Sequence, residues 1–186
     1  MRLGLGLGSL MLLLVVRPAA AADWQMETSA SRLEFVASIQ NGPAAGVFNS
    51  FDTRLHFEPD TPAEARLEVS IDITSADMHN AELNDAVKGP LWLDFEHHPA
   101  AAFHSRSIER IDTSHFLAHG ELELKGVRRP VDVPFEWQQV DDRASMRGEL
   151  SIARGDFDIG GGEWASSETV SGTVIVRFKV ELRKQR

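Results

Sequence analysis

The chain has no cysteine and no tyrosine among its 186 residues. Without cysteine it can form no disulfide, no thiolate metal site, no cysteine nucleophile and no lipid-modified N-terminal cysteine. Basic residues are also scarce, with 19 lysines and arginines against 28 aspartates and glutamates and a formal charge of -9. Because a nucleic-acid backbone needs a basic surface, this balance argues against DNA or RNA as a partner.

What is present is the composition of a globular protein, 42% hydrophobic and 25% charged, at a length that suits one domain. Residues 1–22 have the pattern of a secretory signal peptide, with Arg2, an apolar run from Leu3 to Val16 and a small-residue cleavage site at Ala20 to Ala22. The run is shorter than the roughly 20 residues of a membrane anchor. We predict cleavage before Asp23, one domain over residues 23–186 and, in a Gram-negative host, a periplasmic location.

Almost all of the remainder alternates apolar and polar residues with period two, which is typical of strands with one buried face. The clearest row is Ala65, Leu67, Val69, Ile71 and Ile73, and turn residues such as Lys125-Gly126 separate such rows. Eight strands are predicted within 33–39, 47–57, 65–73, 101–108, 116–124, 131–137, 146–152 and 170–182, with Phe48 out of phase in the second.

Only residues 80–99 interrupt this rhythm, with a short helix predicted over Ala81 to Lys88, after a cap at Asn80 and before Gly89-Pro90. The predicted fold is all-β, an extended eight-stranded antiparallel lipocalin-like barrel with a short helical insert between strands three and four. A sandwich is the other architecture that such strands form. A closed barrel of this size has a lumen that side chains fill or that holds one slim ligand.

An outer-membrane barrel also alternates, but it turns its apolar face outward. The absence of tyrosine removes the usual interfacial girdle, and the chain ends in Arg183-Lys184-Gln185-Arg186 rather than in an aromatic strand end. The protein is therefore predicted not to span a membrane.

The sequence shows no pattern typical of catalysis or metal binding. Of the seven histidines, His97 and His98 are neighbours, and His115 and His119 would lie about 13 Å apart along one strand. No serine stands in a nucleophile elbow and there is no H-E-x-x-H. We predict no metal, no cofactor and no enzymatic activity. The segment from Gly160 to Trp164 is predicted to be a flexible loop before the last strand. The other interpretation is that Glu163 and Trp164 line a ligand entrance.

Arg154 follows the inward phase of Leu150 and Ile152, so it is expected in the lumen or at its rim. A buried guanidinium needs a partner. One interpretation pairs Arg154 with a carboxylate such as Asp156, and the other directs it at the head group of a ligand.

Four segments occur in a characteristic order: Gly46 to Phe51; Asn80 to Phe95 followed by His98-Pro99; Gly120 to Val131, with the pattern G-x-L-x-L-x-G-V-x-x-P-V; and Ile152 to Ile159, with the pattern I-x-R-x-D-F-x-I. Together they resemble the YceI-like family, secreted lipocalin-like proteins that bind polyisoprenoid and other long-chain lipids. The resemblance runs from about Asp23 to Arg186. It implies an extended barrel with a hydrophobic ligand along its axis, and it does not imply catalysis.

The predicted function is a secreted binding protein that carries or sequesters a long-chain apolar ligand: a polyisoprenoid, an isoprenoid quinone or a fatty-acid derivative. The alternatives are a packed, ligand-free barrel with a structural or partner-binding role, and a hydrolase of lipid-like substrates. A homodimer is left open. The residues predicted to contact the ligand are Phe35, Phe51, Leu55, Leu67, Val69, Ile71, Phe116, Leu122, Phe135, Trp137, Met146, Ile152, Arg154, Trp164, Val174 and Phe178.

Overall fold

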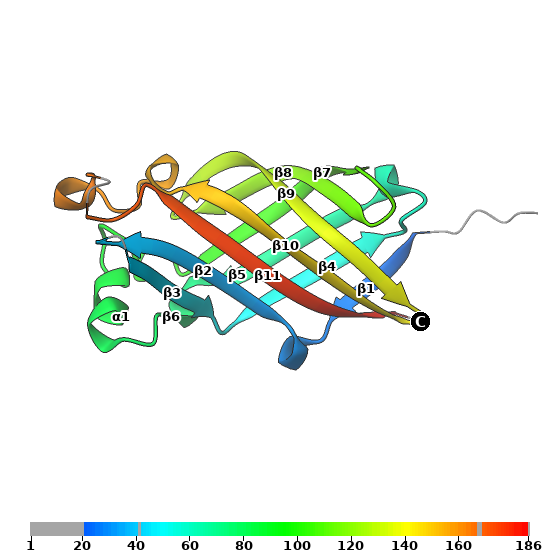
Figure 1. Ribbon diagram of the computed structural model, residues 1–186, viewed down its shortest axis with the longest axis horizontal. Helices are drawn as coiled ribbons and strands as arrows, with labels where there is room; N and C mark the ends of the chain where they lie inside the picture. Colours follow the sequence, from blue (N-terminus) through cyan, green and yellow to red (C-terminus); the bar gives the residue numbers. More distant parts are fainter. Residues whose placement is uncertain (1–20, 41, 167–168, 186) are drawn as a thin grey trace, which may run out of the picture.

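The computed structural model describes residues 21–40, 42–166 and 169–185, which form a closed antiparallel barrel (Figure 1). Eight strands pair in a ring, in the order β1-β4-β5-β7-β8-β9-β10-β11 and back to β1, so the predicted barrel is confirmed. The strands are β1 (Ala22–Met26), β2 (Arg32–Ile39), β3 (Gly42–Phe48), β4 (Phe51–Phe57), β5 (Arg66–Asp72), β6 (Ala76–Asp77), β7 (Ala100–Arg110), β8 (His115–Leu124), β9 (Val127–Val140), β10 (Arg143–Ala153) and β11 (Thr173–Lys184).

The ring is extended at one end by three further short strands. β2 pairs with the first half of β11, β3 pairs with β2, and β6 pairs with the end of β3. A 3₁₀ turn at Thr28–Ala30 separates β1 from β2, and another at Ile73–Ser75 separates β5 from β6. These three strands therefore lengthen the wall of the barrel at that end.

The break between β3 and β4, at Asn49-Ser50, corrects one sequence prediction. A single inward row through Val47 and Phe51 was expected, with Phe48 out of phase. The break shifts the phase instead, so that Phe48 and Phe51 both line the lumen while Val47 does not. The strand β1 was not predicted at all, because its five residues are too short to show a clear alternation.

The predicted signal peptide lies outside the described residues except for Ala21 and Ala22. Ala22 begins β1 and pairs with Phe57 of β4. The position of the cleavage site stays a prediction.

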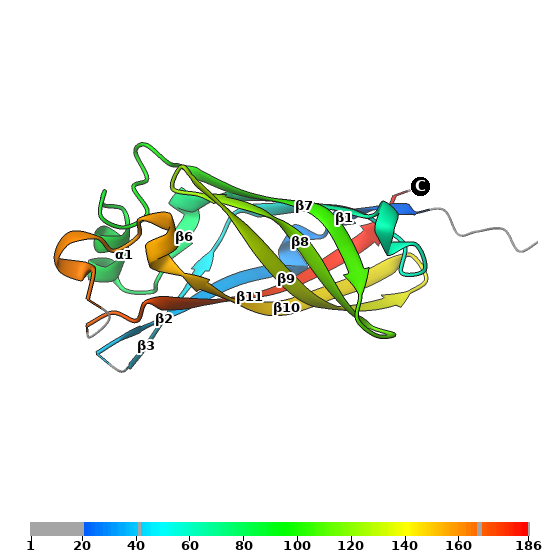
Figure 2. The ribbon, with the colours of Figure 1, turned by 90° about the horizontal axis from the view of Figure 1, so that it is seen from above.

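The helical insert between β6 and β7 is confirmed. Its helix, α1 (Ala81–Val87), begins where the Asn80 side chain accepts a hydrogen bond from the Leu83 N–H at 3.0 Å. Among the described residues, no helix is long and apolar enough to cross a bilayer. Figure 2 places α1 at one end of the barrel, together with the turns Arg154–Phe157 and Gly162–Trp164, and the start of β1 at the other.

Aromatic side chains fill the end of the barrel where β1 begins. Phe57 is fully buried, and its ring centroid lies 5.0 Å from that of Phe116 and 4.9 Å from that of Trp137. Trp24 packs edge-on against Trp137 at 5.1 Å, and Phe135 stacks on Phe116 at 5.5 Å. These five rings are called the aromatic plug below. They leave the α1 end as the place for a cavity.

Candidate functional site

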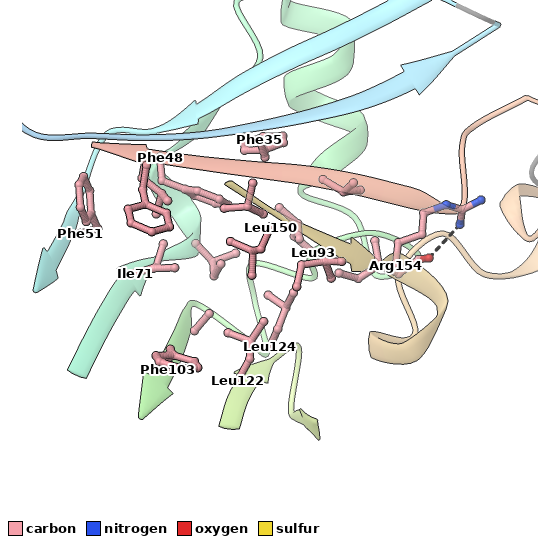
Figure 3. A pocket seen from close by; sticks show the side chains of 18 of the residues that line it. Phe35, Phe48, Phe51, Ile71, Leu93, Phe103, Leu122, Leu124, Leu150 and Arg154 are labelled. Carbon is pink, nitrogen blue, oxygen red and sulfur yellow. Dashed lines mark hydrogen bonds between the residues drawn. The ribbon is translucent and has the colours of Figure 1, made fainter. Parts of the chain in front are cut away.

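A cavity of about 240 Å³ lies between the aromatic plug and the α1 end of the barrel. All of its lining residues are apolar except Thr53 and Arg154. Figure 3 shows this arrangement, with Phe51 at one side of the cavity and Arg154 at the other. Every strand except β1 and β6 contributes to the walls, because the inward rows of these strands are apolar apart from Thr53. The helix α1 and the segment after it add Leu83, Val87, Trp92 and Leu93 at the α1 end.

Of the sixteen predicted contact residues, the structure brings eleven together around this cavity. Their contact with a ligand remains a prediction, but their position in one wall follows from the alternation of the strands. They are Phe35, Phe51, Leu67, Val69, Ile71, Leu122, Met146, Ile152, Arg154, Val174 and Phe178.

The other five do not line the cavity. Phe116, Phe135 and Trp137 face inward as predicted, but they form the aromatic plug. Leu55 is buried in the same hydrophobic cluster. Trp164 lies in the turn Gly162–Trp164, and its ring packs against that of Trp92 with the centroids 5.8 Å apart. An inward direction therefore does not by itself place a side chain beside the cavity.

The sequence reasoning also missed residues that the structure places in the lining. Phe103 was within the weakest predicted strand, and Leu150, Val131 and Val133 were in predicted inward rows but not selected. Phe48 was assigned to the wrong phase. The aromatic Trp92 of the insert had no strand pattern to reveal it. The missed side chains include Phe48, Trp92, Leu93, Phe103, Leu124, Val131, Val133, Leu150 and Val176.

Thr53, on β4, is a polar exception in the cavity wall. It is 1% exposed, and its hydroxyl has no hydrogen-bond partner among the described residues. A buried hydroxyl without a partner costs free energy, so the Thr53 hydroxyl does not stabilise the ligand-free barrel.

Arg154 is the other polar lining residue, and it is 4% exposed. Its side chain is directed at the backbone of the segment that runs from β10 to β11. Nε donates to the carbonyl of Ser171 at 2.9 Å, and Nη1 donates to those of Ile159 and Gly160 at 2.9 and 2.8 Å. Nη2 donates to the carbonyls of Trp164 and Val170 at 2.6 and 3.1 Å. A guanidinium has five N–H donors, and these contacts use all five.

This geometry corrects the interpretation that pairs Arg154 with Asp156. Asp156 is exposed, and within the described part of the chain no ion pair joins it to Arg154. The head-group interpretation stays a prediction, and the use of all five N–H donors by backbone carbonyls argues against it. The guanidinium lies 5.8 Å from the ring centroid of Trp92, so the same side chain ties the insert to the β10–β11 segment.

Charged side chains lie outside the cavity wall, near its α1 end. Nδ1 of His97 lies 2.9 Å from Oδ1 of Asp94. This hydrogen bond lowers the pKa of the Asp94 carboxyl and raises the pKa of His97. Lys125 donates to the carbonyl of Asp158 at 2.7 Å, and burial lowers the pKa of its amine. Among the described residues, no cluster of histidine and carboxylate side chains could hold a metal ion.

The Asp94–His97 pair gives a testable pH dependence. The pair needs an ionised Asp94 and a protonated His97, so it persists between the lowered pKa of the first and the raised pKa of the second. Its contribution is lost when the pH rises through the pKa of His97 or falls through that of Asp94. We expect Asp94→Asn to return the pKa of His97 toward the ordinary histidine value in an NMR titration, with His56 and His115, which are paired with other aspartates, as internal controls. An unchanged His97 titration would contradict this pairing.

The family model for the YceI-like domain matches residues 24–182, from β1 to nearly the end of β11. The chain belongs to the YceI-like family. Its YceI-like relatives include Protein YceI of Escherichia coli O157:H7, which is 29% identical over 164 residues covering 83% of this chain and 85% of that protein. A UPF0312 protein of Yersinia pestis (strain Pestoides F) is 30% identical over 132 residues, covering 69% of this chain and 67% of the other.

Solved structures have the same barrel. Burkholderia cenocepacia BcnA superposes with a TM-score of 0.81 at 29% sequence identity, covering 84% of this chain and 98% of that one. A polyisoprenoid binding domain from Saccharophagus degradans implicated in plant cell wall breakdown gives a TM-score of 0.69 at 18% identity, covering 89% and 99%. At 18% identity, the similarity to the Saccharophagus degradans domain shows the fold alone.

The YceI-like motifs lie around the α1 end of the cavity. In the hairpin between β8 and β9, Gly126 has a φ of 73°, and an added Cβ there would lie 2.8 Å from the His98 ring. In the segment after β10, Ile152, Phe157 and Ile159 form a second buried cluster against the insert. Both motifs therefore close the barrel around the cavity.

Proposed function

We propose that this barrel binds a long-chain apolar ligand in its lumen and carries or sequesters it in the periplasm. The ligand class is a polyisoprenoid, an isoprenoid quinone or a fatty-acid derivative. The observation that carries the proposal is the cavity, whose walls are apolar at every lining residue but Thr53 and Arg154. The polyisoprenoid binding domain with the same fold supports it, as does membership of the family. The signal-peptide pattern of residues 1–22 supports the periplasmic location.

Desolvation supplies the binding free energy in this proposal. Each methylene group that leaves water contributes about 0.8 kcal/mol. A chain with roughly 15 buried carbons would gain on the order of 12 kcal/mol, against an association cost of about 4–15 kcal/mol. A preformed cavity keeps that cost low, because the protein loses little freedom on binding.

Two alternatives are less well supported. A packed barrel with a purely structural or partner-binding role needs no apolar cavity, yet the α1 half of the lumen is hollow. A lipid hydrolase needs a nucleophile activated by a base. The polar side chains of the lining are Thr53, whose hydroxyl has no partner in the described part of the chain, and Arg154, whose donors are all engaged with backbone carbonyls.

The test is native mass spectrometry of the protein produced with residues 1–22 and collected from the periplasm. We expect an adduct whose mass corresponds to a long-chain lipid, and recovery of that lipid in an organic extract. After delipidation, the protein should bind phytol, a methyl-branched C20 alcohol, with micromolar or tighter affinity. A folded, delipidated protein that binds no long-chain alcohol would leave the packed barrel as the better account.

A matched pair of variants separates lumen binding from surface adsorption. Val174 lines the cavity, whereas Val140 is 74% exposed. Val174→Trp should fill ligand space and weaken phytol binding by about tenfold, since lost burial of one or two carbons is worth 1–2 kcal/mol. Val140→Trp should leave binding unchanged. Circular dichroism of both variants checks that neither tryptophan has unfolded the barrel.

A further inference from the structure

Phe35 and Gly46 face each other across the antiparallel pair of β2 and β3, and both side-chain positions point into the lumen. The Phe35 ring lies over the glycine. A Cβ added at Gly46 would meet only that ring among its nearest atoms, with Cε2 at 2.8 Å and Cε1 at 2.9 Å. Real Cβ atoms essentially never come this close to another heavy atom. The ring thus occupies the space that a side chain at position 46 would need.

The backbone at Gly46 does not itself require glycine. Its φ lies outside the left-handed region that favours glycine. Gly120 and Gly148 differ in this respect, because an added Cβ at those positions would also collide with the backbone carbonyl of His104 or Pro134. At Gly46 the requirement for glycine comes from the Phe35 ring.

The position of this ring matters to the cavity. Phe35 is part of the cavity wall and packs against Phe48 with the ring centroids 4.9 Å apart. Figure 3 shows Phe35 between Arg154 at one side and Phe51 at the other. An added Cβ at position 46 would point toward the lumen, so it would push the ring in that direction.

We propose that the Phe35–Gly46 pair sets the width of the cavity and determines whether a methyl-branched chain fits. This inference rests on the proposed function. With glycine at position 46 the ring lies flat against the wall and the lumen admits a chain with methyl side groups. With a Cβ at position 46 the ring narrows the lumen, and a straight chain fits better than a branched one.

The test compares two C20 alcohols, the methyl-branched phytol and the straight 1-eicosanol, on the full folded protein. For Gly46→Ala we expect a loss of about tenfold or more in phytol affinity, because one misplaced methyl group in a tight apolar pocket costs 10-fold or more. We expect less than a threefold change for 1-eicosanol. Gly155→Ala is the matched control, since an added Cβ there meets nothing within 4 Å. It should change neither affinity.

A double-mutant cycle checks that the ring is the cause. In a Phe35→Ala background no ring lies over position 46. Adding Gly46→Ala should therefore change the ratio of the phytol and 1-eicosanol affinities by less than twofold. If Gly46→Ala alone fails to fold, Phe35→Leu with Gly46 retained tests the same idea. It removes the ring and should raise the phytol to 1-eicosanol affinity ratio at least threefold.

The outcomes separate this inference from the proposed function. If the wild-type protein binds both alcohols and Gly46→Ala weakens both equally or neither, the width role is overturned while lipid binding stands. A Phe35→Leu ratio equal to that of the wild type overturns it in the same way. If the wild-type protein binds neither alcohol, the proposed function fails and the inference falls with it.

Discussion

Replacing Arg154 by methionine is expected to lower the free energy of unfolding by about 3–5 kcal/mol, because several buried carbonyls lose a hydrogen bond and each such loss costs about 1–3 kcal/mol. Methionine keeps much of the stem volume and removes the five N–H donors. The carbonyls of Ile159, Gly160 and Val170 would then lose their hydrogen bonds to the guanidinium in a buried setting. Urea unfolding with linear extrapolation measures the change.

Arg147→Met is the matched control, on the strand β10 that ends immediately before Arg154. Arg147 is about half exposed and pairs with Glu136 on the outer surface of the barrel at 3.5 Å. Exposed ion pairs of this kind contribute about 0–1 kcal/mol, so the control should unfold close to the wild type. Equal, small losses in both variants would show that the contacts of Arg154 do not hold the β10–β11 segment.

The same variant decides the remaining question about ligand head groups. Because all five donors are used inside the protein, Arg154→Met should change the affinities for phytyl phosphate, phytol and the hydrocarbon phytane by the same factor. A direct hydrogen bond to a charged head group is worth about 1.5–3 kcal/mol. A selective loss of phytyl phosphate binding by about tenfold or more would therefore restore the head-group role.

Most of the inward rows could be predicted from the sequence because period-two alternation is a local property. Ala65, Leu67, Val69, Ile71 and Ile73 reveal their strand without any knowledge of its neighbours. The prediction was wrong where a local break resets the phase, as Asn49-Ser50 does between β3 and β4. Asn49 and Ser50 are residue types that favour turns, but two such residues without glycine or proline do not by themselves show where a strand ends.

The extent of the cavity could not be predicted in the same way. Phe51 and Phe57 lie on one strand with the same phase, yet Phe51 lines the cavity and Phe57 belongs to the aromatic plug. The difference depends on the rings that β8 and β9 bring to Phe57 from 59 to 80 positions further along the chain. Periodicity gives the face of a strand, whereas cavity volume depends on how side chains from distant strands meet along the axis.

The partners of Arg154 could not be predicted from the sequence, because they are backbone groups. Its inward phase was predicted from Leu150 and Ile152, and the structure has it buried. A sequence indicates hydrogen-bond partners only through the types of its side chains, and Asp156 is the nearby side chain with a carboxylate. The actual partners include the backbone carbonyls of Ile159, Gly160, Trp164, Val170 and Ser171, and every residue type has a carbonyl.

Phe57→Ala and Phe51→Ala should separate the plug from the cavity, because they make the same substitution on the same strand. Phe57 is fully buried against three other aromatic rings. Its truncation should cost about 3–5 kcal/mol in the free energy of unfolding, from lost burial and the new void. Phe51 already borders empty space and is only partly buried, so its truncation should cost less than about 2 kcal/mol.

The loss of ligand affinity should have the opposite order, larger for Phe51→Ala than for Phe57→Ala. Phe51→Ala removes part of the wall that a chain would contact, and we expect phytol affinity to fall by about fivefold to tenfold, which corresponds to the loss of 1–1.4 kcal/mol of apolar contact. Phe57→Ala should leave phytol affinity within about threefold of the wild type, since the residue lies outside the cavity lining. Urea unfolding and phytol titration of both variants give the four values. A larger affinity loss for Phe57→Ala than for Phe51→Ala would mean that the ligand reaches through the aromatic plug, because only then would contact with Phe57 contribute to binding.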